Sequence, residues 1–264
     1  MTKQGRTAVI VVLDKSGSMG DVREATIGAF NEFLEDQKKV PGEVLLTLVL
    51  FDTVVVTHHL NQPLEVASKL THDNYRPSGM TALYDAVGAT IDRVGAHLSQ
   101  MPEGERPERV LVVIQTDGME NMSREYSARR VADMIEHQRS RYAWDFMFLG
   151  ADQDAWLQAG KMGIKRGSTV SYDHTNVGTR SAMLVVNSTV RGYRTSVGGQ
   201  SVAQSLVEQN ANDIRDQKKA IKKAAADLAS AAADFADAQK APKKSPKKAP
   251  AQKAPTSDPA RRRR

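Results

Sequence analysis

The sequence predicts an α/β fold, in which an open and mostly parallel sheet is covered by helices on both faces. Two observations support this fold. Continuous apolar runs rich in Val, Ile and Leu recur along the chain without polar alternation, which is typical of strands buried on both faces. Amphipathic segments follow most of these runs, and a helical crossover is the usual connection between parallel strands. A chain of 264 residues has room for one such domain and for additional segments.

The N-terminal part begins with a strand and a helix and continues with a hairpin. The first strand is expected at 7–13 (TAVIVVL), where the apolar run is unbroken. Apolar side chains then recur at helical spacing over 21–37, until a Pro-Gly pair ends the helix. The apolar runs 44–51 and 53–60 are joined too closely for a crossover, so they should form a hairpin. Its second strand is the predicted antiparallel edge strand of the sheet.

The remaining elements continue the alternation of helices and strands. In order, the sequence predicts a helix at 82–98, a strand at 109–116, a helix at 124–138, a strand at 144–149, a short helix at 155–162, a weak strand at 169–172 and a last helix at 177–189. We assign residues 1–195 to this domain, a doubly wound, Rossmann-like sheet.

The pattern changes after residue 195. Residues 196–204 are rich in Gly and Ser and are interpreted as a linker. Residues 205–239 lack Pro and Gly and place an apolar side chain at every seventh position, which predicts a long Ala-rich helix. This helix either folds back on the domain or mediates self-association as a coiled coil. In 240–264 proline recurs and the only apolar side chains are alanines, so we expect a disordered basic tail.

Charge distinguishes the tail from the rest of the chain. Ten of the 37 basic residues and one of the 31 acidic residues lie in 240–264. The formal net charge of +6 is therefore made of +9 in the tail and −3 in the remainder. Ten cations could contact nucleic-acid phosphates without reading sequence, and the KKSPKKAP segment resembles linker-histone tails. A solubilising tail or a tether to an acidic protein explains the same composition.

Several function classes are disfavoured. Without cysteine the chain has no disulfide, thiolate zinc site or cysteine nucleophile. It contains no P-loop, GxSxG or GxGxxG motif, and phosphatases of the DxDx(T/V) type need a carboxylate where Ser16 stands, so we expect no enzyme.

No stretch approaches the roughly 20 apolar residues of a membrane helix, and no secretory signal is evident. We expect a soluble, cytoplasmic protein with no membrane partner.

Polar side chains gather at three loops near the carboxyl ends of predicted parallel strands. Asp14, Ser16 and Ser18 follow the first strand, Thr81 closes a loop before the helix at 82–98, and Asp117 follows the strand at 109–116. Ligands bind at this edge of open parallel sheets. Because all donor atoms are oxygens, the set suits a hard cation and not zinc. Helix capping is the alternative role for Asp14 and the two serines.

The DxSxS motif at Asp14, Ser16 and Ser18, Thr81 in GMTAL and Asp117 in TDG resemble the metal-ion-dependent adhesion site of von Willebrand factor A-type domains. The resemblance covers roughly residues 5–195, and we expect the intracellular bacterial or phage type. It implies that both serine hydroxyls bind Mg²⁺ or Mn²⁺ directly and that Thr81 does so directly or through water. The two aspartates would hold the metal chiefly through bound waters.

The resemblance also implies a function. A cation with neutral hydroxyl ligands stays electrophilic, and a Glu or Asp of a partner protein would complete its coordination. We therefore expect a metal-dependent protein interaction module. The alternative is a nucleic-acid-associated scaffold that uses the basic tail at 240–264.

Other polar residues are expected to have no such role. Asp52, Glu120 and Asn121 could shape the rim of the site, but we interpret them as solvated loop residues. His58 and His59 are adjacent on an edge strand, where successive side chains point to opposite faces, so no metal site is expected there.

Overall fold

The computed structural model describes residues 2–151, 155–195, 207–209, 212 and 219. Its centre is a six-stranded sheet in the order β3-β2-β1-β4-β5-β6. The pair β2–β3 is antiparallel and the other pairs are parallel, which confirms the predicted sheet and its edge strand. The strands are β1 (Lys3–Asp14), β2 (Glu43–Phe51), β3 (Val55–Pro63), β4 (Pro107–Thr116), β5 (Asp145–Ala151) and β6 (Thr169–Tyr172).

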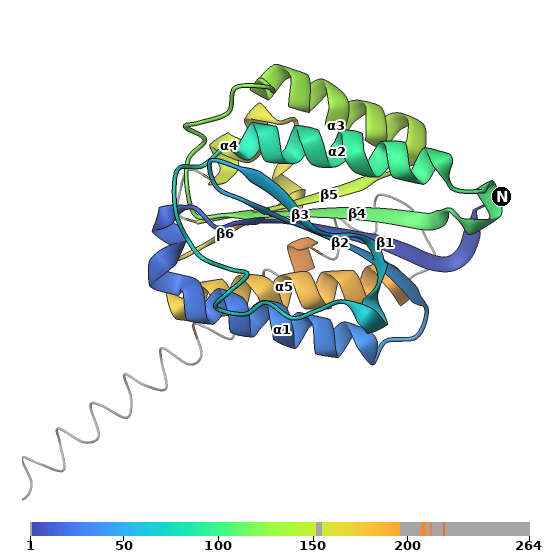
Figure 1. Ribbon diagram of the computed structural model, residues 1–264, viewed down its shortest axis with the longest axis horizontal. Helices are drawn as coiled ribbons and strands as arrows, with labels where there is room; N and C mark the ends of the chain where they lie inside the picture. Colours follow the sequence, from blue (N-terminus) through green and yellow to red (C-terminus); the bar gives the residue numbers. More distant parts are fainter. Residues whose placement is uncertain (1, 152–154, 196–206, 210–211, 213–218, 220–264) are drawn as a thin grey trace, which may run out of the picture. The chain divides into compact units, whose positions relative to one another are not determined.

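Helices cover both faces of the sheet (Figure 1). One face is covered by α1 (Arg23–Lys38) and α5 (Asn176–Thr195). The other is covered by α2 (Leu83–Gln100), α3 (Ala128–Tyr142) and α4 (Ala155–Lys161). The predicted doubly wound α/β architecture is thereby confirmed.

The central strand β1 explains the unbroken apolar run. From Thr7 to Asp14 every residue is buried. Val9, Val11 and Leu13 belong to the core beneath α1 and α5, whereas Ile10 and Val12 belong to the core on the α2 side. Both sets are apolar because side chains alternate between two buried faces.

Strand order brings the polar loops together. Strand β2 lies next to β1 on one side, and β4 lies next to β1 on the other side. Loops that leave neighbouring strands in opposite directions open a crevice at their carboxyl ends, which is where ligands bind in such sheets. Asp14 ends β1 and Thr116 ends β4, so both lie at this position.

Two helices begin later than predicted. The segment before α1 is a 3₁₀ helix, η1 (Gly17–Val22). The predicted helix 124–138 begins only at Ala128 because the Asp85 carboxylate accepts hydrogen bonds from the backbone N–H groups of residues 124, 125 and 126. Ser127 then caps α3 by accepting from the N–H of Arg130. A long-range contact therefore replaces the first helical turn.

A β-bulge in β3 overturns the expectation for the two histidines. Leu48 of β2 pairs with His59, but the next residue, Val49, pairs with Thr57, so His58 is an extra residue in the strand. Such a bulge redirects side chains. The His58 and His59 rings lie side by side, with 4.4 Å between their centroids, instead of on opposite faces.

Most of the C-terminal segments fall outside the described residues. These are the predicted linker 196–204, the tail 240–264 and most of the helix 205–239. Val207, from the beginning of that helix, is helical and 2% exposed, and it belongs to the core beneath α1 and α5. None of the helices in the described part of the chain is long and apolar enough to span a membrane.

Candidate metal site at the carboxyl edge of the sheet

Three loops are joined at the carboxyl edge of the sheet by main-chain hydrogen bonds. The first loop follows β1, the second precedes α2 and the third follows β4. Between the first and second loops, Gly17 N–H donates to the main-chain oxygen of Gly79 at 3.1 Å, and the main-chain oxygen of Lys15 accepts from the N–H of Ser78 at 2.9 Å. Between the third and second loops, Asn121 N–H donates to the main-chain oxygen of Thr81 at 3.1 Å. The loop before α2 therefore links the loops that follow β1 and β4.

Asp14 is fully buried at the base of this cluster. Its Oδ1 accepts from the N–H of Ser16 at 2.6 Å, and its Oδ2 accepts from the hydroxyl of Thr116 at 2.5 Å. Burial raises the pKa of Asp14 to about 6, although these hydrogen bonds oppose the shift. Both donors are neutral, so a bound cation would offset the cost of burying the ionised carboxylate.

A chain of hydrogen bonds leads from Ser16 to Asp117. The hydroxyls of Ser16 and Ser18 are 3.2 Å apart, and Ser18 Oγ donates to Oδ1 of Asp117 at 2.9 Å. The other oxygen of Asp117 lies 2.8 Å from Nε2 of His174. The Asp117 side chain is only 1% exposed.

Thr81 completes the predicted set. Its side chain is buried, and its N–H donates to Oδ1 of Asn121 at 2.9 Å. A Cβ atom placed on Gly118 would lie 2.9 Å from the Thr81 hydroxyl oxygen, so only glycine leaves this oxygen room beside the TDG loop. The five predicted ligands, from three loops, are thus gathered at one edge of the sheet.

The donor set fits a hard divalent cation. Two buried carboxylates and three hydroxyls converge, and carboxylate, hydroxyl and water oxygens are the ligands that Mg²⁺ and Mn²⁺ prefer. In the described residues, no three Asp, Glu or His side chains lie close enough to hold a metal by themselves, so a metal here needs the hydroxyls. Ser16 occupies the N-cap of η1 without a capping hydrogen bond from its side chain, which disfavours capping as its role.

The expectation that Asp52 is solvated is wrong. Asp52 is 6% exposed and forms an ion pair with Lys15. It also accepts from the N–H of Val54 at 2.8 Å and from the hydroxyl of Ser78 at 3.0 Å. Burial alone would raise the pKa of Asp52, but the hydrogen bonds, led by that from Lys15, lower it below its ordinary value. Asp52 therefore contacts both the loop after β1, through Lys15, and the loop before α2, through Ser78.

Glu120 and Asn121 lie in a solvated loop as expected, and both also hold backbone groups of the neighbouring loop and α2 in place. Glu120 accepts from the N–H of Tyr84 at 3.0 Å and from the N–H groups of Met122 and Ser123 at 2.8 and 2.7 Å. Asn121 is exposed but positions Thr81, as described above. Both residues fix the third loop against the start of α2.

Sequence reasoning missed two residues that contact the aspartates. Tyr75 is fully buried and donates its hydroxyl to the main-chain oxygen of Asp14 at 2.6 Å. No pattern in the sequence indicates this contact. His174 follows β6 by two residues, and its position after a parallel strand was the available signal for a role near Asp117.

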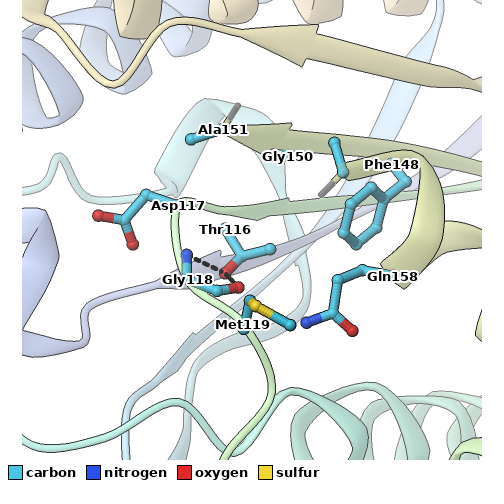
Figure 2. Close-up of a pocket in the computed structure, with 9 residues that line it drawn as sticks. Thr116, Asp117, Gly118, Met119, Phe148, Gly150, Ala151 and Gln158 are labelled. Atoms are coloured by element: carbon cyan, nitrogen blue, oxygen red, sulfur yellow. Dashed lines mark hydrogen bonds between the residues drawn. The ribbon is translucent and has the colours of Figure 1, made fainter. Parts of the chain in front are cut away.

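A small pocket of about 70 Å³ lies beside the loop after β4. In Figure 2 the Asp117 carboxylate points away from Gln158 and Met119, which lie across this pocket. Gln158 of α4 is 3% exposed, and neither its amide oxygen nor its nitrogen has a hydrogen-bond partner within the described residues. The pocket adjoins the candidate metal site, and Thr116 and Asp117 contribute to its lining.

No protein-family model and no curated protein matches the sequence. Solved structures do match. The vWF domain of the type V pili tip protein Mfa5 from Porphyromonas gingivalis aligns with 74% of this chain and 98% of that one, at 9% identity and a TM-score of 0.51. Proximal thread matrix protein 1 from the mussel byssus aligns with 69% of this chain at 12% identity and a TM-score of 0.51.

The alignment spans only 45% of the mussel protein's own chain. At these identities the similarity concerns the fold. The order of elements, the antiparallel edge strand and these neighbours agree with one another. The described domain therefore has the von Willebrand factor A fold.

Proposed function

We propose that this domain is a metal-dependent protein interaction module. Mg²⁺ or Mn²⁺ would be held by Asp14, Ser16, Ser18, Thr81 and Asp117. The observation that carries the proposal is the hydrogen-bonded path from buried Asp14 through Ser16 and Ser18 to buried Asp117. It brings together oxygen ligands separated by about a hundred residues of sequence.

The neutral ligands decide what the cation can do. When bound, the metal supplies a Lewis-acidic site for a carboxylate from outside the domain. Hydroxyls add no negative charge, so the ion keeps more attraction for an anionic ligand than it would among four carboxylates. A Glu or Asp side chain of a partner protein is the ligand that we propose.

Exposed apolar side chains flank the site. Met80 and Met119 are each 48% exposed, and they lie in the loops before α2 and after β4. Methionine is flexible and polarisable, and it is common on surfaces that bind protein partners. We propose that these two side chains contact the partner around its metal-bound carboxylate.

Metal binding tests the first half of the proposal. Mn²⁺ titrated into the full chain, followed by its electron paramagnetic resonance signal, should show one site per chain that Mg²⁺ competes for. Ser16→Ala with Ser18→Ala should abolish that site. Ser140→Ala, which changes an exposed serine of α3, is the matched control. Equal Mn²⁺ binding by all three proteins would refute the site.

Partner capture tests the second half. The immobilised protein should retain a partner in Mg²⁺ and release it in EDTA, and the double serine variant should retain none. Substitution of the partner's acidic residues should then remove binding. If capture persists unchanged in EDTA, the domain binds its partner by another surface.

A further inference from the structure

The bulge in β3 creates a second cluster of potential metal ligands. His58 and His59 come from consecutive positions, yet their rings are 4.4 Å apart and inclined by 59°. His59 is 7% exposed and His58 is partly exposed. Adjacent residues of a regular strand would not allow this, so the cluster depends on the extra residue in the strand.

Both imidazoles direct a nitrogen toward Ser68. Nε2 of His58 lies 3.5 Å from the Ser68 hydroxyl oxygen, and Nε2 of His59 lies 3.3 Å from the same atom. Nε2 of His59 is also 3.2 Å from the main-chain oxygen of Ser68. Two ring nitrogens therefore converge on the Ser68 hydroxyl oxygen, and one of them also lies near the main-chain oxygen of Ser68.

The protonation state of His58 suits metal binding. Burial, and secondly the neighbouring His59, lower the pKa of His58 below its ordinary value. A neutral imidazole has a free electron pair on one ring nitrogen and is a good ligand for late first-row metals. Imidazole nitrogen does not suit Mg²⁺, which prefers oxygen.

We propose that His58 and His59, together with Ser68, bind Cu²⁺, Ni²⁺ or Zn²⁺ at the edge strand of the sheet. This site is separate in its residues and in its chemistry from the oxygen site at the carboxyl edge. Ser68 is exposed, so its hydroxyl can turn aside and the cation can take its place between the two nitrogens. Among the described residues no third Asp, Glu or His joins the cluster, so water and the main-chain oxygen of Ser68, which lies 3.2 Å from Nε2 of His59, complete the coordination.

Metal preference provides the first test. The Irving–Williams order predicts that Cu²⁺ binds most tightly, ahead of Ni²⁺ and Zn²⁺. Cu²⁺ should be titrated into the full chain in which Ser16→Ala and Ser18→Ala remove the oxygen site. The electron paramagnetic resonance spectrum should show two nitrogen ligands. A spectrum without nitrogen coupling would overturn the proposal.

Histidine variants provide the second test. His58→Gln and His59→Gln should each weaken Cu²⁺ binding roughly 100-fold, because one imidazole holds the ion at a high effective concentration for the other. His72→Gln, at a histidine whose side chain is 61% exposed, is the control and should change nothing. Equal affinity in the His58, His59 and His72 variants would overturn the proposal.

The alternative is that Ser68 merely links β3 to the chain that follows it. Ser68→Ala should then lower stability, and the wild-type protein should bind no Cu²⁺ at the pair. We expect Ser68→Ala to retain Cu²⁺ affinity within a few-fold.

A measurement without substitutions guards against unfolded variants: in wild-type protein, the imidazole resonances that Cu²⁺ broadens first should be those of His58 and His59. Broadening that starts at other histidines contradicts the site.

Discussion

Nε2 of His174 lies 2.8 Å from Oδ2 of Asp117, while Oδ1 of the same carboxylate accepts a hydrogen bond from Ser18. The carboxylate is therefore held from both sides. His174 follows β6, the edge strand opposite β3, so a distant part of the chain fixes the orientation of a candidate metal ligand.

Removal of this contact should weaken metal binding. Groups that orient a metal ligand typically contribute about 10- to 100-fold to metal affinity. We expect His174→Ala to raise the Mn²⁺ dissociation constant by about 10-fold, and His174→Gln, which keeps a donor, to raise it less. Mn²⁺ titration measures both. If His174→Ala binds Mn²⁺ as tightly as wild type, the contact does not position Asp117 for metal.

Metal should stabilise the folded domain. A ligand that binds only the native state at 100 times its dissociation constant adds about 2.7 kcal/mol to the free energy of unfolding. Thermal unfolding in saturating Mn²⁺ should therefore shift upward for wild type. The double variant Ser16→Ala, Ser18→Ala should show no shift. An equal shift in both proteins would place the stabilising ion elsewhere.

A buried carboxylate far from the loops should make stability depend on pH. Burial raises the pKa of Asp145 to about 6 from its ordinary 3.8, against a hydrogen bond from Tyr193. The folded state therefore binds a proton more tightly than the unfolded state. This contribution to stability is present below about pH 4 and is lost as the pH rises through about 6.

The variant Asp145→Asn isolates this effect. It keeps an oxygen that can accept from the Tyr193 hydroxyl, which is 2.7 Å from Oδ2 of Asp145, and it does not titrate. Between pH 4 and pH 7 the stability of wild type relative to the variant should fall by about 2 kcal/mol. Urea unfolding at several pH values measures the difference. Parallel curves for the two proteins would show that Asp145 ionises normally.

The basic tail should carry any nucleic-acid binding. Removal of 240–264 takes away ten basic residues and one acidic residue and leaves a net charge of −3. We expect loss of salt-sensitive binding to duplex DNA at low ionic strength, because phosphate contacts depend on counterion release. Filter retention at increasing salt tests this. If the shortened chain is retained equally, the scaffold alternative fails.

Local patterns predict the sheet and place Asp14, Ser16, Ser18 and Asp117 at its carboxyl edge, whereas Thr81, which follows no parallel strand, is assigned through the family resemblance. Apolar runs mark the strands, and polar residues directly after parallel strands must meet at one edge. Contacts between distant segments were not predictable. Asp85 delays the start of α3 through backbone groups about forty residues away, and Asp52 is buried by its pairing with Lys15.

The histidine pair illustrates the same limit within one strand. Whether successive side chains share a face depends on the register between β2 and β3, and the bulge that sets this register has no sequence signal here. Tyr75 is comparable, since its hydrogen bond to Asp14 depends on the path of a long loop.

The distance in sequence between β1 and β4 has a kinetic consequence. Asp14 and Thr116 are hydrogen-bonded neighbours although 102 residues separate them. Closing so long a loop is slow, and local βα units form before it. Until the two strands pair, Asp117 is apart from Asp14, Ser16 and Ser18, so the proposed metal site is incomplete. A divalent cation should therefore slow the unfolding of this domain and leave its folding rate almost unchanged.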